Sequence, residues 1–201
     1  MTTATDRSPK DRPSESSPTY HTSNVLRLFM ESLGRRREVQ LLDVGPICGN
    51  NINFFVQRVK KLFVCDMFLQ FDKVRRKDIP AKRAWQKLDY PSESFDGILL
   101  WELMDRLDDH DVQTGAERCH RMIKPGGMLV LFDPGDHAVS RGVCSFVVEE
   151  GFQLRIHNQS HIGLTSHRRQ SRDIIAMLAP FIQLRSFIYR NGYREFLFQR
   201  R

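Results

Sequence analysis

The stretch that decides the fold is Leu41-Leu42-Asp43-Val44-Gly45-Pro46-Ile47-Cys48-Gly49-Asn50-Asn51. Residues 39–44 are mostly apolar and predict a buried β-strand that ends near an acid. The glycines permit a tight turn, and apolar residues then recur at helical spacing over residues 52–59. In open α/β sheets ligands bind at the carboxyl ends of the strands, where helix N–H groups favour an anionic end. This corner is therefore the first candidate binding site.

Outward from this corner, short apolar runs alternate with helical patterns. The runs predict further strands at residues 62–65, 97–101 and 128–132. Apolar stripes predict helices at residues 25–33, with Ser23 as cap and Gly34 as stop, and at residues 112–123. Strands that are apolar throughout are buried on both faces, as in a parallel sheet covered by helices. The pattern therefore predicts a doubly wound α/β domain.

The C-terminal fifth departs from this alternation. Residues 173–179 predict a helix, and β-rich residues 181–189 and 193–199 flank Asn191-Gly192, a strong hairpin signal. An antiparallel hairpin is thus expected to finish the sheet.

The binding corner does not fit a dinucleotide. The fingerprint GxGxxG started at Gly45 needs glycines where Ile47 and Asn50 stand. Asp66, 23 positions after Asp43, ends the second predicted strand, where a carboxylate can accept both hydroxyls of a ribose. The alternative is that Asp66 only caps the following helix.

These motifs resemble the class I S-adenosylmethionine-dependent methyltransferases, as a small single-domain member with a divergent glycine loop. Asp43 to Gly49 is similar to the family's first motif, and Asp66 matches its ribose-binding acid. Residues 88–100 resemble the entry to the fourth strand, where Asp89 would contact the adenine amino group, and residues 121–130 the approach to the fifth.

The resemblance implies a Rossmann-like methyltransferase fold: a mostly parallel, seven-stranded sheet with a C-terminal antiparallel hairpin. It implies S-adenosyl-L-methionine as cofactor and no metal. The residues that it assigns to the cofactor are Asp43, Gly45, Pro46, Ile47, Gly49, Asn51, Asp66, Met67, Asp89, Tyr90 and Trp101.

Ile47 stands where the family commonly has its middle glycine. A β-branched side chain disfavours positive φ and takes up space beside the methionine part of the cofactor. One interpretation is a subfamily loop in which Asn51 caps the helix or holds the cofactor carboxylate. The alternative is a decayed pocket in a non-catalytic scaffold protein.

The domain expected from the pattern spans residues 21–201, after a flexible tail at residues 1–20 that is rich in Ser, Thr, Pro and charge. Residues 137–171 are an insertion expected to build the acceptor site. His137 is a weak candidate for a catalytic base, and a plain surface histidine is the alternative.

Charge is unevenly distributed along the chain. Of the net charge of +7, residues 151–201 carry nine arginines and two acids, 9 − 2 = +7, so the remainder sums to zero. This basic region predicts an anionic small-molecule acceptor or, as alternatives, RNA or a merely solvated face. The sequence Trp101-Glu102-Leu103-Met104 lacks the signature typical of amino methylation on DNA bases or glutamine, which counts against those acceptors without excluding RNA.

The composition limits the class of protein to which this chain can belong. Hydrophobic residues make up 40% and charged residues 27%, as in globular domains, and no apolar run is long enough to cross a bilayer. The four cysteines form no CxxC pair and the N-terminus lacks an apolar signal core. We therefore expect a cytoplasmic protein with reduced thiols.

Overall fold

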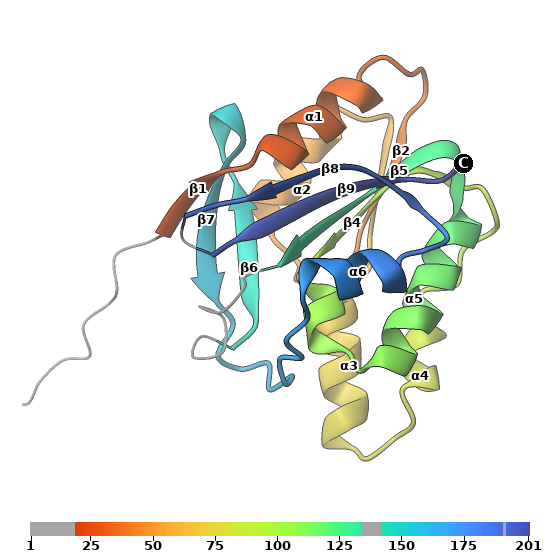
Figure 1. Cartoon of the computed structure of the whole chain (residues 1–201), viewed down its shortest axis with the longest axis vertical. Helices are drawn as coiled ribbons and strands as arrows, with labels where there is room; N and C mark the ends of the chain where they lie inside the picture. Colours follow the sequence, from red (N-terminus) through yellow and green to blue (C-terminus); the bar gives the residue numbers. More distant parts are fainter. Residues whose placement is uncertain (1–18, 134–141, 191) are drawn as a thin grey trace, which may run out of the picture.

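The computed structural model describes residues 19–133, 142–190 and 192–201 (Figure 1). Its main sheet has the strand order β3-β2-β4-β5-β9-β8. The first four strands are parallel: β3 (Lys61–Val64), β2 (Gln40–Asp43), β4 (Phe95–Trp101) and β5 (Ile123–Asp133). The hairpin of β8 (Ile182–Ile188) and β9 (Arg194–Gln199) adds two strands, with β9 antiparallel to both β5 and β8. The predicted α/β sheet with an antiparallel hairpin is confirmed.

The predicted number of seven strands is not confirmed, because the described sheet has six. Between α3 (Met67–Arg76) and β4 the chain forms only the single-turn α4 (Lys82–Trp85) and irregular backbone. Across residues 86–92, all of which are described, Leu88 alone is buried. A segment with one buried residue has no apolar face with which to extend the sheet. The strand β3 is therefore an edge strand.

A second, three-stranded antiparallel sheet was not expected from the sequence. It has the order β1-β7-β6, with β1 (Thr19–Thr22), β6 (Cys144–Val148) and β7 (Gln153–Asn158). Strands β6 and β7 belong to the expected insertion, and a short 3₁₀ turn, η3 (Glu150–Phe152), joins them. Strand β1 begins at Thr19, inside the segment assigned to the tail. The small sheet thus joins the N-terminal end of the described chain to the insertion.

The first two helices show where apolar periodicity is informative. Helix α1 (Asn24–Leu33) begins and ends as predicted: Ser23 Oγ accepts a hydrogen bond from Leu26 N at 3.0 Å, and Gly34 follows the last turn. Helix α2 (Gly49–Val56) follows the glycine loop, but its predicted stripe is wrong in part because Val56 is 51% exposed.

Helices cover both faces of the main sheet and divide the core in two (Figure 1). One core lies against α3, α5 (Asp109–Met122) and α6 (Ser171–Met177), the other against α1, α2 and the small sheet. Along β4, Ile98 and Leu100 enter the first core, whereas Leu99 and Trp101 enter the second. The end of β4 therefore presents Trp101 toward the small sheet. Among the described residues no helix is long and apolar enough to span a membrane.

Candidate active site

The acid at the end of β2 is held inside the loop that it begins. The Asp43 side chain is buried, and its Oδ1 accepts hydrogen bonds from Gly45 N at 2.9 Å and from the Trp101 Nε1 at 2.6 Å. Burial raises the pKa of Asp43 to about 6, although the two hydrogen bonds act in the opposite direction. Asp43 therefore fixes both the glycine turn and the Trp101 indole.

Trp101 is the last residue of β4 and has a positive φ of 52°. Its buried indole lies nearly parallel to the rings of Phe132 and Phe146, with centroids 5.2 and 5.6 Å away. A Cβ atom at Gly45 would lie 2.4 Å from Trp101 Cδ1. Gly45 is thus required by close contact with this indole, whereas a Cβ atom at Gly49 would meet nothing within 4 Å.

The tip of the loop meets the end of β3. Ile47 N donates to Asp66 Oδ2 at 3.3 Å, while Asp66 Oδ1 accepts from Leu69 N at 2.8 Å and caps α3. The Ile47 side chain is 67% exposed, and neighbouring Pro46 is half-buried. Asp66 therefore acts as the helix cap that the sequence offered as an alternative. Since a carboxylate has about four lone-pair sites, this does not use up its capacity to accept hydrogen bonds.

Met67, Asp89 and Tyr90, which were also assigned to the cofactor, differ in the exposure of their side chains. Met67 is fully buried, so its side chain belongs to the core. The exposed Asp89 side chain pairs with Arg121 at 3.2 Å. Tyr90 is half-buried against the rings of Phe63 and Phe95, and burial raises the pKa of its hydroxyl.

Asn51 has a role that sequence reasoning missed. Its amide nitrogen donates to Phe146 O and its amide oxygen accepts from Val148 N, both at 2.8 Å. The side chain is buried and does not cap α2, whose N-cap residue is Cys48. Asn51 therefore fastens β6, and with it the ring of Phe146, over the glycine loop.

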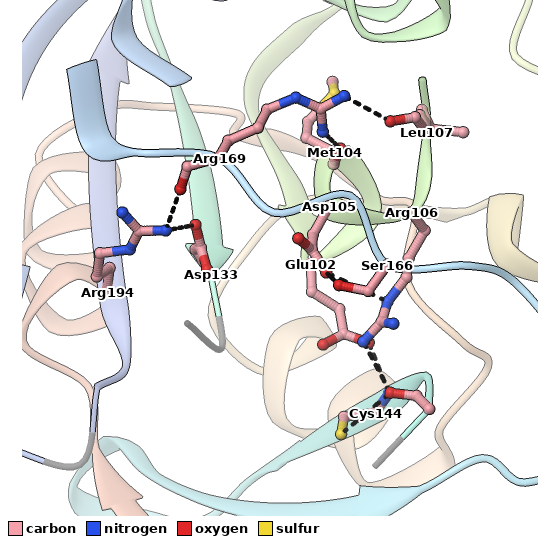
Figure 2. A network of polar contacts seen from close by, with 11 residues as sticks. Glu102, Met104, Asp105, Arg106, Leu107, Asp133, Cys144, Ser166, Arg169 and Arg194 are labelled. Carbon is pink, nitrogen blue, oxygen red and sulfur yellow. Dashed lines mark hydrogen bonds and ion pairs between the residues drawn. The ribbon is translucent and has the colours of Figure 1, made fainter. Parts of the chain in front are cut away.

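The loop after β4 is tied to the insertion by a buried ion pair (Figure 2). Glu102 Oε1 accepts from Arg106 Nη2 at 3.0 Å and from Cys144 N at 2.6 Å, and Arg106 also donates to Gly142 O at 2.7 Å. Burial raises the pKa of Glu102 to about 7, opposed by the charge of Arg106. Glu102 lies just before the 3₁₀ helix η1 (Leu103–Arg106), and Arg106 ends it. The i, i+4 spacing of the two residues is the only feature of the sequence that indicates this ion pair.

A second part of the same network holds the returning segment of the insertion (Figure 2). Arg169 donates to the carbonyl oxygens of Met104 and Leu107, each at 2.7 Å, and pairs with Asp109 at 2.7 Å. Arg194 pairs with Asp133 and donates to Arg169 O at 2.6 Å. These arginines therefore hold the fold together.

The same holds for other arginines of the basic C-terminal region. Arg155 pairs with Glu149 at 2.7 Å, and Arg200 pairs with Glu93 at 3.0 Å. By contrast the Arg172 side chain is 79% exposed, and its one ion pair within the described ranges is a 3.5 Å contact with Asp173. Much of the positive charge counted in the sequence is thus matched by acids elsewhere in the chain.

The candidate base His137 lies outside the described residues. The described ranges contain no group of three or more His, Cys, Asp or Glu side chains placed to hold a metal ion. All four cysteines are free thiols, and burial raises the pKa of Cys119 to about 12.

Part of the sequence and the fold of the chain are similar to those of known proteins. Residues 42–131 match a family model described as a methyltransferase domain. A search of the curated proteins found no match.

Among solved structures, the chain is similar to the N-methyltransferase NodS from Bradyrhizobium japonicum WM9 in complex with S-adenosyl-L-homocysteine. The TM-score is 0.53 and the sequence identity 17%, and the match covers 88% of this chain and 83% of that chain. It is also similar to an S-adenosylmethionine-dependent methyltransferase from Mesorhizobium loti (TM-score 0.55, 13% identity, 81% and 91% coverage). A third is the 1,6-didemethyltoxoflavin-N1-methyltransferase from Burkholderia thailandensis, with bound 1,6-didemethyltoxoflavin and S-adenosylhomocysteine (TM-score 0.50, 14% identity, 88% and 78% coverage).

Proposed function

We propose that the chain is a class I S-adenosylmethionine-dependent methyltransferase that transfers the methyl group of this cofactor to a small organic acceptor. The observation that carries the proposal is the meeting of the glycine loop with Asp66 at the carboxyl ends of β2 and β3. Two adjacent parallel strands there present a carboxylate beside a turn of backbone amides, as a nucleoside ligand requires.

The residues present fit the adenosine end of the cofactor. Asp66 would accept from the ribose hydroxyls, and Asp89, exposed beside Tyr90, would accept from the adenine amino group. The side chain of Ile47 is directed toward solvent, which favours binding over the decayed pocket considered from sequence. Gly45, Pro46 and Gly49 would contribute through their backbone.

At the other end, the Trp101 indole lies against Gly45 and donates to Asp43. We propose that Asp43 and Trp101 border the methionine part of the cofactor. Asn51 would act indirectly, by holding Phe146 against Trp101.

S-adenosylmethionine, when bound, supplies an electrophilic methyl group on a sulfonium with a good leaving group. The protein then has to orient the acceptor and exclude water. The rings of Trp101, Phe132 and Phe146 form an apolar wall suited to excluding water. A base is needed only if the acceptor loses a proton early, and His137 remains the proposed candidate.

The small-molecule acceptor is supported by the similar structure from Burkholderia thailandensis, which holds 1,6-didemethyltoxoflavin. We propose that the insertion at residues 137–171, of which β6 and β7 are described, forms one side of the acceptor site. Arg169 is engaged with the loop after β4, so an anionic acceptor has little support from this residue.

Calorimetric titration with S-adenosylhomocysteine, with NAD as the control ligand, tests the proposal. Asp66→Asn keeps an N-cap side chain but removes the charge, and should weaken binding about 10- to 100-fold because a charge-assisted hydrogen bond to ribose is worth about 1.5–3 kcal/mol. Ile47→Gly should leave the dissociation constant within about threefold, since that side chain is directed toward solvent.

Two results would count against the proposal. If the folded protein binds neither adenosyl ligand, the scaffold interpretation takes its place. If Ile47→Gly alone creates binding, the loop is a decayed site rather than a subfamily form.

A further inference from the structure

A groove with a cationic lining runs along α3, α4 and the residues that follow each of these helices. Its volume is about 250 Å³. The lining residues are Gln70, Lys73, Val74, Lys77, Ile79, Arg83, Gln86 and Lys87. A second hollow shares Ile79, Arg83 and Gln86 with it and adds Lys82. Together they form one track, which we call the α3–α4 groove.

The cations of the α3–α4 groove face solvent without acidic partners. Lys73, Lys77, Lys82, Arg83 and Lys87 are all exposed, and within the described ranges none forms an ion pair. No acid belongs to either lining. Their mutual repulsion is therefore uncompensated and favours an anionic ligand.

The nearest acid on α3 is already neutralised. Buried Asp72 pairs with Arg76 at 2.6 Å and with Arg75 at 3.5 Å, and it accepts from Gly163 N at 2.9 Å. Asp78, in the turn between the two helices, is exposed and lies outside both linings. The two arginines of α3 therefore pair with Asp72, whereas Lys73 and Lys77 form no ion pair within the described ranges.

We propose that the α3–α4 groove binds the phosphate backbone of a nucleic-acid strand. Five cations spread over two adjoining hollows suit a row of phosphates better than a single anion. The linings contain two glutamine amides and no aromatic ring, so the contacts reach phosphate and sugar and carry no base specificity.

The α3–α4 groove begins beside the proposed cofactor site but does not share its residues. Asp66 caps α3, and Cys65 Sγ lies 3.6 Å from Lys87 O, so the carboxyl end of β3 adjoins one end of the groove. Nucleic acid bound there would anchor the protein without entering the acceptor site. The inference is therefore independent of which acceptor is methylated.

Fluorescence anisotropy with a labelled single-stranded RNA 20-mer tests the inference on the full chain. Four neutralised phosphates give a slope of about −3 for log K against log salt, or about 50-fold weaker binding at 200 mM than at 50 mM salt. Removing four groove cations should weaken binding at 50 mM salt at least about tenfold and bring the slope near zero. The variant combines Lys73→Gln, Lys77→Gln, Arg83→Gln and Lys87→Gln.

A matched control removes the same charge from exposed arginines of the C-terminal region and should keep the wild-type affinity and slope. It combines Arg172→Gln, Arg185→Gln, Arg190→Gln and Arg201→Gln. Both variants should retain the wild-type thermal midpoint and S-adenosylhomocysteine affinity, which separates this inference from the proposed function.

Three outcomes would overturn the inference. The first is equal loss of RNA binding in both variants, which would indicate net charge alone. The second is no RNA binding by the wild type at 50 mM salt. The third is equally tight, groove-dependent binding of a polyglutamate peptide or of vesicles with anionic lipids, which would assign the groove to an acidic protein or a membrane.

Discussion

The chain has two basic regions, and the structure treats them in opposite ways. The arginines of residues 151–201 carry the whole formal excess of charge, yet Arg155, Arg169, Arg194 and Arg200 all pair with acids of the same chain. The α3–α4 groove sits in a part of the chain whose charges sum to zero, yet its cations have no acidic partners in the described structure. Position relative to acids, rather than a count along the chain, decides which charge is available to a ligand.

The largest expected effect is on the free energy of unfolding when a paired arginine of residues 151–201 is replaced. Arg169→Met leaves the carbonyl oxygens of Met104 and Leu107 without donors, in a place where the side chain is only 8% exposed. We expect a loss of about 2–4 kcal/mol in the free energy of unfolding. Urea denaturation measures it.

The control for this substitution is Arg172→Met, three positions along the chain. Its side chain is 79% exposed, so its effect should stay within about 0.5 kcal/mol. Similar losses for both variants would break the distinction between paired and exposed arginines.

The next effect is a pH dependence that arises at Asp105, beside Arg106 and Ser166. Burial raises the pKa of Asp105 to about 6, against the hydrogen bond from Ser166 and the charge of Arg106. Because this folded pKa lies above the usual value of 3.8, the carboxyl stabilises the fold below about pH 4 and loses that contribution as pH rises through about 6.

Asp105→Asn removes this titration. The unfolding free energy of the wild type minus that of Asp105→Asn should therefore fall by about 1–3 kcal/mol from pH 4 to pH 7, then level off. Denaturation curves at a series of pH values check it. A difference that rises with pH would mean that the arginines dominate over burial.

The smallest effect belongs to the α3–α4 groove. Lys87→Gln relieves repulsion among exposed cations, so it should stabilise the protein by about 0.3 kcal/mol at 10 mM salt. At 500 mM salt the gain should vanish, since exposed charges are then screened. A loss of stability at low salt would indicate an acidic partner for Lys87 and argue against a free cationic groove.

Local sequence predicted those parts of the fold that depend on near neighbours. The cap at Ser23, the stripe on α1 and the hairpin around Gly192 are properties of short segments, and they form as expected. The order of acid, glycine turn and helix at Asp43 likewise placed the candidate site at the end of β2.

Other features depended on partners far apart in the chain. The small sheet pairs residues more than 130 positions apart in β1 and β7, and Asn51 binds β6 residues 95 and 97 positions away. Neither strand pairing nor an amide reaching a distant backbone leaves a periodic signal in the sequence. For the same reason the sequence did not show that residues 86–92 add no strand to the described sheet. Only the folded structure shows that Leu88 is the one buried residue among them.

The sequence by itself determined the α/β class, the hairpin, and the glycine corner, which lies within the residues that match a methyltransferase domain model. It did so because strand and helix periods and turn residues act over a few positions. Only the tertiary structure decided that Gly45 accommodates Trp101 and that Asp66 both caps α3 and meets the loop. It also decided that the cations without acidic partners in the described structure line the α3–α4 groove. Close packing and ion pairing act over a few ångströms, so they depend on which groups, distant in the sequence, the fold brings together.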